Sequence, residues 1–204
     1  MNQQYQENIQ ENMQIPPTDI TELYNKIMEN LPQFRTPEEL KSELFYMKKN
    51  SDTAVEEFRK ILLDFTDILV KITDSVLIKK YHDDIIKSIN QYPKNIIDTF
   101  IIHGYMNNNG TYRKEIIEGN DSFFLGEEYN KYTNGDSSIV DHIFQFKSFW
   151  SKLDQDNKFL IKTFLITLCH YSDYRFIIFK RYQEIKKEYS SNYSNIFNYF
   201  DTLI

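Results

Sequence analysis

The sequence predicts an all-α fold: one helical, bundle-like domain that carries a long glycine-containing loop. Apolar residues recur every three or four positions from Val55 to Val76, which is the spacing of one helix face. A strong helix-start signal stands at Thr36-Pro37-Glu38-Glu39, where Thr36 is an N-cap, Pro37 takes the first helical position and Glu39 completes a capping box. All five glycines fall between 104 and 135, so the residues that best end helices are confined to one window.

Length and composition limit the classes of protein to consider. A chain of 204 residues, 41% of them hydrophobic, suits one medium domain. The net charge of −6 does not favour extensive phosphate binding. A single cysteine, Cys169, excludes an internal disulfide framework and a cysteine-based zinc site. The first residues have neither a cationic start nor an apolar run, and no uncharged stretch approaches a membrane span of about 20 residues, so we expect an intracellular, soluble chain.

The amino-terminal part divides into an arm and a first helix. Residues 1–18 are rich in Gln and Asn and end in two prolines, so we predict a disordered or partner-ordered arm and a helical domain over 19–204. Thr18 or Asp19 is the expected N-cap of a short helix that ends at Pro32. Its predicted inward residues are Ile20, Leu23, Tyr24 and Ile27.

Two helices are predicted between Thr36 and Asp74. The first has Leu40, Leu44, Phe45 and Met47 as its inward residues, and we expect it to break at 50–52. The second begins at another capping box, formed by Thr53 and Glu56. Its apolar seam contains Val55, Phe58, Leu62, Phe65, Leu69, Ile72 and Val76, broadened by Ile61 and Ile68. A face of this width favours a bundle within one chain over a two-stranded coiled coil.

Shorter helices and the glycine window follow. Asp74-Ser75 interrupts the pattern, a helix is expected over 76–90, and Pro93 separates it from another over 94–102. We predict a long loop over about 103–136, with one helical turn from Tyr112 to Glu118 that Gly119 stops. A hairpin turning at 118–121 is the alternative. Phe123, Phe124 and Leu125 are expected to anchor the loop to the core.

The carboxy-terminal third predicts the centre of the fold. A helix at about 139–150 ends at Trp150, whose ring is expected to cap the core. Asp154 then caps a central helix with inward residues Leu160, Ile161, Phe164, Leu165 and Leu168, widened by Phe159 and Ile166. Asp173 is the expected start of an aromatic helix, 190–194 a weak break, and 190–204 a final helix.

No pattern predicts catalysis, a metal site or a cofactor, so we expect a protein that is not an enzyme. His82-Asp83-Asp84 occupies adjacent helical positions that do not share a face, and a solvated face is the simpler interpretation. Cys169 is interpreted as a small buried apolar residue rather than a nucleophile paired with His170. The glycine spacing fits no phosphate-binding loop. An enzyme would require His103, Asp141, His142 and the loop glutamates to converge.

Two segments are candidate binding surfaces. The final helix has apolar residues on one face and could dock a partner or fold back on its own core. Its candidate partner-binding residues are Tyr193, Ile196, Phe197, Phe200 and Leu203. A basic helix over 175–187 is interleaved with aromatic residues, a mixture that binds single strands in other proteins, although Glu184 and Glu188 dilute its charge. Its candidate nucleic-acid-binding residues are Arg175, Lys180, Arg181, Lys186 and Lys187, and a solvated face above a core-facing aromatic stripe is the alternative that we favour.

Three segments resemble a family of uncharacterised proteins from nucleocytoplasmic large DNA viruses, also called giant viruses. They are the segment at 64–72, which begins Asp64-Phe65 and is similar to the family's acidic–Phe–x–x–Asp–Leu helix, the aliphatic pair, acidic turn and Phe at 116–125, and the signature at 142–168 that includes Phe149-Trp150. The family has no assigned activity, so the resemblance implies no catalytic residues. It implies a viral protein of the host cytoplasm, with the virion or the viral factory as its place of action. Together with the helical pattern, it leads us to expect a non-enzymatic protein that acts through protein–protein contact, with a nucleic-acid accessory protein as the alternative.

Overall fold

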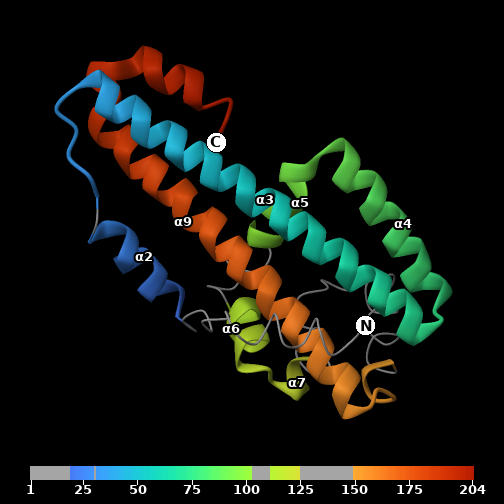
Figure 1. The fold of residues 1–204 in the computed structure, drawn as a ribbon. Helices are drawn as coiled ribbons and strands as arrows, with labels where there is room; N and C mark the ends of the chain where they lie inside the picture. Colours follow the sequence, from blue (N-terminus) through green and yellow to red (C-terminus); the bar gives the residue numbers. More distant parts are fainter. Residues whose placement is uncertain (1–18, 30, 103–110, 125–148) are drawn as a thin grey trace, which may run out of the picture.

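The structure is a computed structural model that describes residues 19–29, 31–102, 111–124 and 149–204 (Figure 1). Every element in these ranges is a helix, which confirms the all-α prediction. The helices are α2 (Ile20–Met28), α3 (Pro37–Thr73), α4 (Val76–Gln91), α5 (Pro93–Ile101), α6 (Thr111–Glu118), α7 (Asp121–Phe124) and α9 (Gln155–Phe200). The predicted arm at 1–18 lies outside the described residues, as does most of the helix predicted at 139–150.

The long helices α3 and α9 lie side by side and form the centre of the fold (Figure 1). They run antiparallel, because Ser51 meets Arg175 whereas Phe65, further along α3, meets Phe164, which comes earlier in α9. The helix α2 packs on α9, and α4 and α5 pack on α3. Among the described helices none is both long and apolar enough to cross a bilayer.

The predicted break at 50–52 is wrong, because α3 continues from Pro37 to Thr73. It begins as expected, with the Thr36 hydroxyl accepting a hydrogen bond from the Glu39 amide at 3.2 Å. Thr53 does not start a new helix, since its hydroxyl donates to the Lys49 carbonyl one turn earlier. Ser51 is buried at the contact with α9, where its hydroxyl accepts from Arg175. One hydroxyl is thus satisfied between helices and the other within α3, and the backbone stays helical.

The predicted helix start at Asp173 is also wrong, because α9 (Gln155–Phe200) continues through this position and departs from helical geometry only at Tyr193. Asp154 caps it as expected, accepting from the Asn157 amide at 2.7 Å. Asp173 lies in the middle of the helix, where its buried carboxylate accepts hydrogen bonds from Arg113 of α6. The weak break expected at 190–194 corresponds to a kink at Tyr193, whose φ of −134° and ψ of 37° are not helical.

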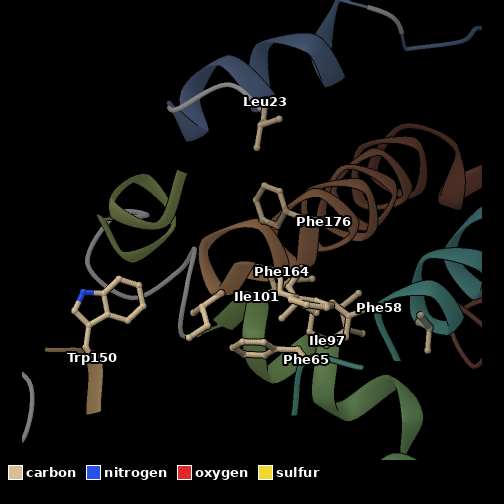
Figure 2. Packing of buried hydrophobic residues seen from close by; sticks show 11 residues of the cluster. Leu23, Phe58, Phe65, Ile97, Ile101, Trp150, Phe164 and Phe176 are labelled. Carbon is tan, nitrogen blue, oxygen red and sulfur yellow. The ribbon is translucent and has the colours of Figure 1, made fainter. Parts of the chain in front are cut away.

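The first core lies between α3, α5 and α9 (Figure 2). Phe65 stacks on Phe164 with ring centroids 5.6 Å apart, and Phe58 meets Phe100 edge-on at 5.4 Å. Trp150 is a completely buried member of this core, as its position before the central helix predicts. The buried members of this core are Leu23, Val55, Phe58, Phe65, Ile97, Ile101, Trp150, Ile161, Phe164, Leu168 and Phe176.

Some residues expected in the apolar faces lie in solvent instead. Phe159 of α9 is 49% exposed, so it does not widen the central face. Val76 is exposed because α3 ends at Thr73 and a new helix, α4, begins at Val76 after the left-handed Asp74 and the N-cap Ser75. The seam of α3 is therefore one member shorter than its spacing predicts.

A second core joins the beginning of α3 to the end of α9. Its buried members are Leu40, Leu44, Met47, Ile178, Tyr182, Ile185, Phe197 and Phe200. Phe45 was expected to face inward with its neighbours but is 51% exposed. It stands one position from Leu44, and therefore about 100° away around the helix from the buried line.

The described part of the glycine window is helical. Gly119 stops α6 as predicted, with a left-handed φ of +63° that glycine adopts readily. The hairpin alternative is wrong, since α6 and α7 lie on either side of its proposed turn. Ile116 and Ile117 pack against Cys169 of α9. The remainder of the predicted loop, Leu125 included, and the side chains of Phe123 and Phe124 lie outside the described residues.

Candidate interaction surface

The chain after the kink, residues 194–204, folds back over the second core and is called the C-terminal segment below (Figure 1). Phe197 and Phe200, two of the candidate partner-binding residues, are buried in that core. Tyr193, Ile196 and Leu203 are partly buried and pack against it. The segment thus takes the fold-back arrangement that the sequence left open, and binding of a partner by these five residues stays a prediction.

A polar latch holds the C-terminal segment on α9. The Tyr182 hydroxyl donates to Oδ1 of Asp201 at 2.7 Å, and Nζ of Lys186 donates to both carboxylate oxygens at 2.8 Å. The hydrogen bonds from Lys186 and Tyr182 lower the pKa of the Asp201 carboxyl. Burial, together with the neighbouring Asp201, raises the pKa of Tyr182. The hydroxyl therefore stays a donor and the carboxyl an acceptor.

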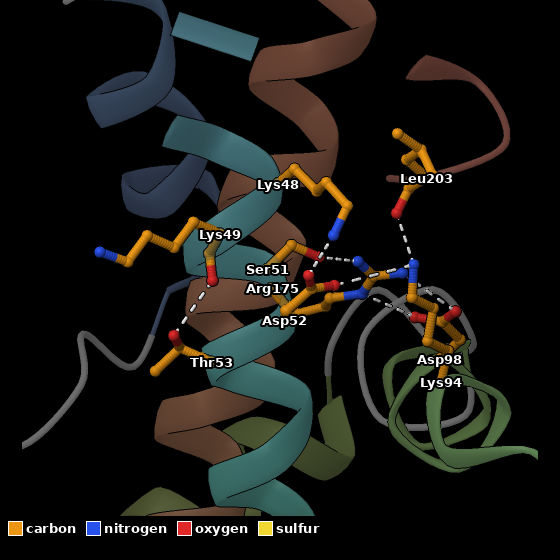
Figure 3. Close-up of polar contacts among 9 residues, drawn as sticks. All are labelled: Lys48, Lys49, Ser51, Asp52, Thr53, Lys94, Asp98, Arg175 and Leu203. Atoms are coloured by element: carbon orange, nitrogen blue, oxygen red, sulfur yellow. Dashed lines mark hydrogen bonds and ion pairs between the residues drawn. The ribbon is translucent and has the colours of Figure 1, made fainter. Parts of the chain in front are cut away.

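A second set of contacts, which we call the polar junction, lies where α3, α5 and α9 meet the C-terminal segment (Figure 3). Arg175 is only 4% exposed, and its Nε and Nη2 donate to the Asp98 carboxylate at 3.1 and 3.3 Å. Its Nη1 donates to the Ser51 hydroxyl. The buried guanidinium therefore has a counter-charge from α5 and an acceptor from α3, which compensates for its removal from water.

Lys94 extends the junction to the chain end. Its Nζ donates to the Leu203 carbonyl and lies 4.0 Å from Oδ1 of Asp52, which also pairs with Lys48 (Figure 3). Burial and the nearby charge of Arg175 lower the pKa of Lys94. Within the described ranges no group of three or more His, Cys, Asp and Glu side chains could hold a metal ion. The polar junction therefore connects α5 to α9 through side chains of opposite charge, and Lys94 connects α5 to the C-terminal segment.

An exposed aromatic pair lies where the C-terminal segment packs on α3. Phe45 of α3 and Tyr199 of the C-terminal segment are 51% and 55% exposed, with ring centroids 6.4 Å apart. Both rings also contact the buried Phe200 edge-on, at 4.9 and 5.1 Å. The pair is therefore held in a defined geometry although half of its surface faces water.

An open groove continues from Phe45 along the outer face of α3, and we call it the α3 groove. Its lining residues are Phe45, Lys48, Lys49, Asp52, Thr53, Glu56 and Glu57. They recur at the three- and four-residue spacing of one helix face. The two lysines lie near the aromatic end and the two glutamates at the other. Lys48 pairs with Asp52, Glu56 with Arg59 and Glu57 with Lys60, so Lys49 is the groove lysine for which no such pair is seen among the described residues of this face.

The candidate nucleic-acid-binding residues do not form one basic surface. Arg175 is buried in the polar junction, and Arg181 pairs with Glu43 at 3.0 Å. Lys186 belongs to the latch, Lys187 lies 4.0 Å from Glu184, and Lys180 lies over the Phe176 ring. The acidic neighbours thus offset much of the charge that a phosphate backbone would require.

His82 and Cys169 have structural roles. His82 was expected on a solvated face, but its Nδ1 lies 3.0 Å from the Thr66 hydroxyl and its Nε2 3.3 Å from Asp67, so it joins α4 to α3. Cys169 is buried as predicted, and burial, reinforced by the charge of Asp173, raises the pKa of its thiol. Of the residues of the enzyme hypothesis, Glu115 and Glu118 lie in α6. The others lie outside the described residues: His103, Glu127, Glu128, Asp141 and His142.

No protein-family model matches the chain, and no curated protein or solved structure matches it. Sequence reasoning missed the groove and the polar junction. The spacing of the α3 groove was visible in the sequence, but the contacts of Arg175 join residues that are 77 and 124 positions apart.

Proposed function

We propose that this chain acts through protein–protein contact, by binding a helical segment of a partner protein in the α3 groove. The exposed aromatic pair, Phe45 and Tyr199, carries the proposal. Large rings that a buried neighbour already holds in place lose little conformational freedom on binding, and such rings are frequent energetic centres of interfaces. The protein acts as a binding module in this proposal, without catalysis and without a cofactor.

The charges of the groove specify the chemistry of the partner. Lys49 and Glu57 stand eight positions apart on α3, which corresponds to about 12 Å along the helix axis. A complementary helix would place an apolar side chain on the aromatic pair, an acidic residue near Lys49 and a basic residue about two turns away, near Glu57, where it would replace the exposed Lys60 as the partner of that carboxylate. An amphipathic segment of this kind is the proposed partner.

The proposed biological setting rests on the resemblance to the giant-virus family alone. In that setting the partner is a viral or host protein met in the host cytoplasm, the viral factory or the virion. The alternative, a nucleic-acid accessory role for the basic helix, draws no support from the described geometry, because Arg175 is buried and Arg181 is paired with Glu43. Binding of single-stranded nucleic acid in a gel-shift titration at ~0.1 M salt would favour that alternative.

The experiment compares matched variants of the tagged full chain as bait in infected cells. Proteins bound to the wild type are identified by mass spectrometry, and their recovery is measured with Phe45→Ala/Tyr199→Ala and with the control Phe159→Ala. Phe159 is 49% exposed but belongs to α9 and does not line the groove, so it matches the loss of an exposed ring. We expect the double variant to lose about 10-fold or more of the partner, and the control to retain it.

A second pair of variants tests the charges. Lys49→Glu reverses a groove lysine, whereas Lys41→Glu makes the same change at an exposed position of α3 outside the groove. We expect only Lys49→Glu to weaken the complex, with a difference that shrinks as salt is raised. Equal recovery with the double aromatic variant and the wild type would contradict the proposal, as would equal losses in the two members of either pair.

A further inference from the structure

The direction of the C-terminal segment depends on one residue. Across the 46 residues of α9 the only non-helical backbone conformation is that of Tyr193, at φ −134° and ψ 37°. The neighbouring sequence, Ser190-Ser191-Asn192, consists of weak helix formers. A change to helical dihedrals at this single position would straighten α9 and carry the C-terminal segment away from its own core.

If the C-terminal segment left its own core, apolar side chains on both the segment and the core would be exposed to water. Phe197 and Phe200 are each 1% exposed, and their departure would also uncover Leu40, Leu44 and Ile185 of the second core. Exposure of this much apolar surface is unfavourable. A straightened α9 therefore requires a replacement surface that has the same shape and the same polar partners.

We infer that a second copy of this chain supplies that surface, so that two chains exchange their C-terminal segments. Each segment would then cover the second core of the other chain, with Phe197, Phe200 and Asp201 contributed in trans. This inference does not depend on the proposed function. In the exchanged dimer, however, two chains would form each exposed aromatic pair, with Tyr199 from one chain and Phe45 from the other.

The geometry of the fold-back favours such an exchange. The segment runs antiparallel to the end of α9, with Asp201 against Lys186 and Tyr182, and Phe197 against Tyr182. The point halfway between positions 182 and 201 falls at 191–192, next to the kink. Two straight α9 helices that cross antiparallel at this point would reproduce the same contacts between chains, related by a two-fold axis.

The closed monomer and the exchanged dimer thus share their contacts and differ at the hinge. Their balance is set by protein concentration and by the backbone preference of residue 193. Alanine favours the helical dihedrals that a straight α9 requires, whereas glycine does not. Tyr193→Ala and Tyr193→Gly remove the same ring and so form a matched pair. With two hinges per dimer, we expect the dimer dissociation constant of the Ala variant to be roughly 30-fold lower than that of the Gly variant.

The decisive test detects the contact between Lys186 and Asp201 by chemical cross-linking. Two differently tagged full-length copies are co-expressed and recovered by tandem affinity purification, one with Lys186→Met and the other with Asp201→Asn. Neither copy can join positions 186 and 201 within itself. A zero-length carbodiimide, which couples an amine to a carboxylate in direct contact, can then form the Lys186–Asp201 amide only between chains. A pair in which both copies carry Lys186→Met is the control.

We expect a covalent dimer whose cross-linked peptide maps to Lys186 and Asp201, absent from the control and more abundant when both copies carry Tyr193→Ala than Tyr193→Gly. Three results would overturn the inference. They are a dimer without this cross-link, no recovery of mixed dimers even at high concentration with Tyr193→Ala, and equal dissociation constants for the two hinge variants in light-scattering titrations.

Discussion

The guanidinium of Arg113 in α6 donates two hydrogen bonds, of 2.7 and 2.6 Å, to the carboxylate of Asp173 in α9. Both side chains are buried, at 1% and 5% exposure, and the two residues are 60 positions apart in sequence. Two residues later Arg175 makes the corresponding contact with Asp98 of α5. The central helix thus carries a buried acid and a buried base that fix the positions of two other helices against it.

Removing the Asp173 carboxylate leaves the buried Arg113 guanidinium without this counter-charge. We expect Asp173→Leu to lower the free energy of unfolding by about 3–5 kcal/mol. The double variant Arg113→Met/Asp173→Leu should lose less than Asp173→Leu alone, because no buried charge remains. Urea unfolding measures both. Lys162→Met, at the more exposed pair with Asp121, is the control and should cost about 1 kcal/mol or less. A double variant as unstable as the single would contradict this account.

The polar junction predicts a smaller effect at Asp98. Its side chain is 44% exposed, yet it neutralises the buried guanidinium of Arg175. We expect Asp98→Asn to lower the unfolding free energy by about 1–3 kcal/mol, since a buried charge loses its partner while an amide oxygen can still accept. Asp84→Asn, at a solvent-exposed pair with Lys87, should change it by less than about 0.5 kcal/mol. Similar values for the two variants would show that the junction is not a stabilising contact.

The latch at Asp201 predicts a dependence of stability on pH. The pKa of its carboxyl is lowered in the folded chain from an ordinary value of 3.8, so the folded state favours the ionised form. The stabilisation is therefore fully present above the ordinary pKa and is lost as pH falls through the lower, folded pKa. We expect the difference in unfolding free energy between wild type and Asp201→Asn to be about 1 kcal/mol or less near neutral pH, because the pair is partly exposed.

Denaturant unfolding of both proteins at several pH values measures this difference. It should be constant from about pH 7 to pH 5 and should shrink below about pH 4. Comparison of the two proteins cancels the titration of the other carboxylates. A difference that grew on acidification would rule out the latch as described.

Two phenylalanines of α9 form a matched pair for the core. Phe164 is 2% exposed and stacks on Phe65, whereas Phe159, five positions earlier, is 49% exposed. We expect Phe164→Ala to cost about 3–5 kcal/mol of unfolding free energy and Phe159→Ala less than about 1 kcal/mol. Thermal or urea unfolding followed by circular dichroism suits an all-helical chain. Comparable losses would contradict the assignment of Phe164 to the core and of Phe159 to the surface.

Cys169 predicts a slow thiol reaction in the native state. Its side chain is fully buried, and burial raises its pKa, so both access and ionisation are suppressed. We expect Ellman's reagent to react at least about 100-fold more slowly with the native chain than with the chain in denaturant. Because the chain has only one cysteine, the measurement needs no control for other thiols. Rapid reaction without denaturant would place the thiol at an accessible site.

Signals confined to one helical turn predicted the helix starts well. Thr36 and Asp154 each cap a helix by accepting from an amide three positions later, and Asp19 accepts from an amide two positions later, so all the information lies in neighbouring residues. The same kind of signal failed at Thr53 and Asp173, which lie inside continuous helices. A polar residue that breaks a helix in water keeps its helical backbone when a hydrogen bond inside the helix or a buried partner satisfies its side chain.

The candidate site was predicted less well than the fold. The aromatic and apolar residues of the final helix were recognised, but their direction toward their own core was left open. Phe45 was predicted to face inward with Leu44 and Met47, but it lies about 100° from Leu44 around the helix and is exposed. Tyr199 became part of a surface only because the kink at Tyr193 brings it beside α3.

The sequence alone determined that this chain is helical, where its capped helices begin, and that the 3–4 apolar spacing of α3 and α9 builds a core. These properties depend on residues within a turn or two of one another. Tertiary structure decided the continuity of α3 and α9, the pairing of Arg113 with Asp173 and of Arg175 with Asp98, and the fold-back at Tyr193. Each depends on a group far away in sequence, because a buried charge or an apolar face is stable only when a distant segment supplies its counterpart.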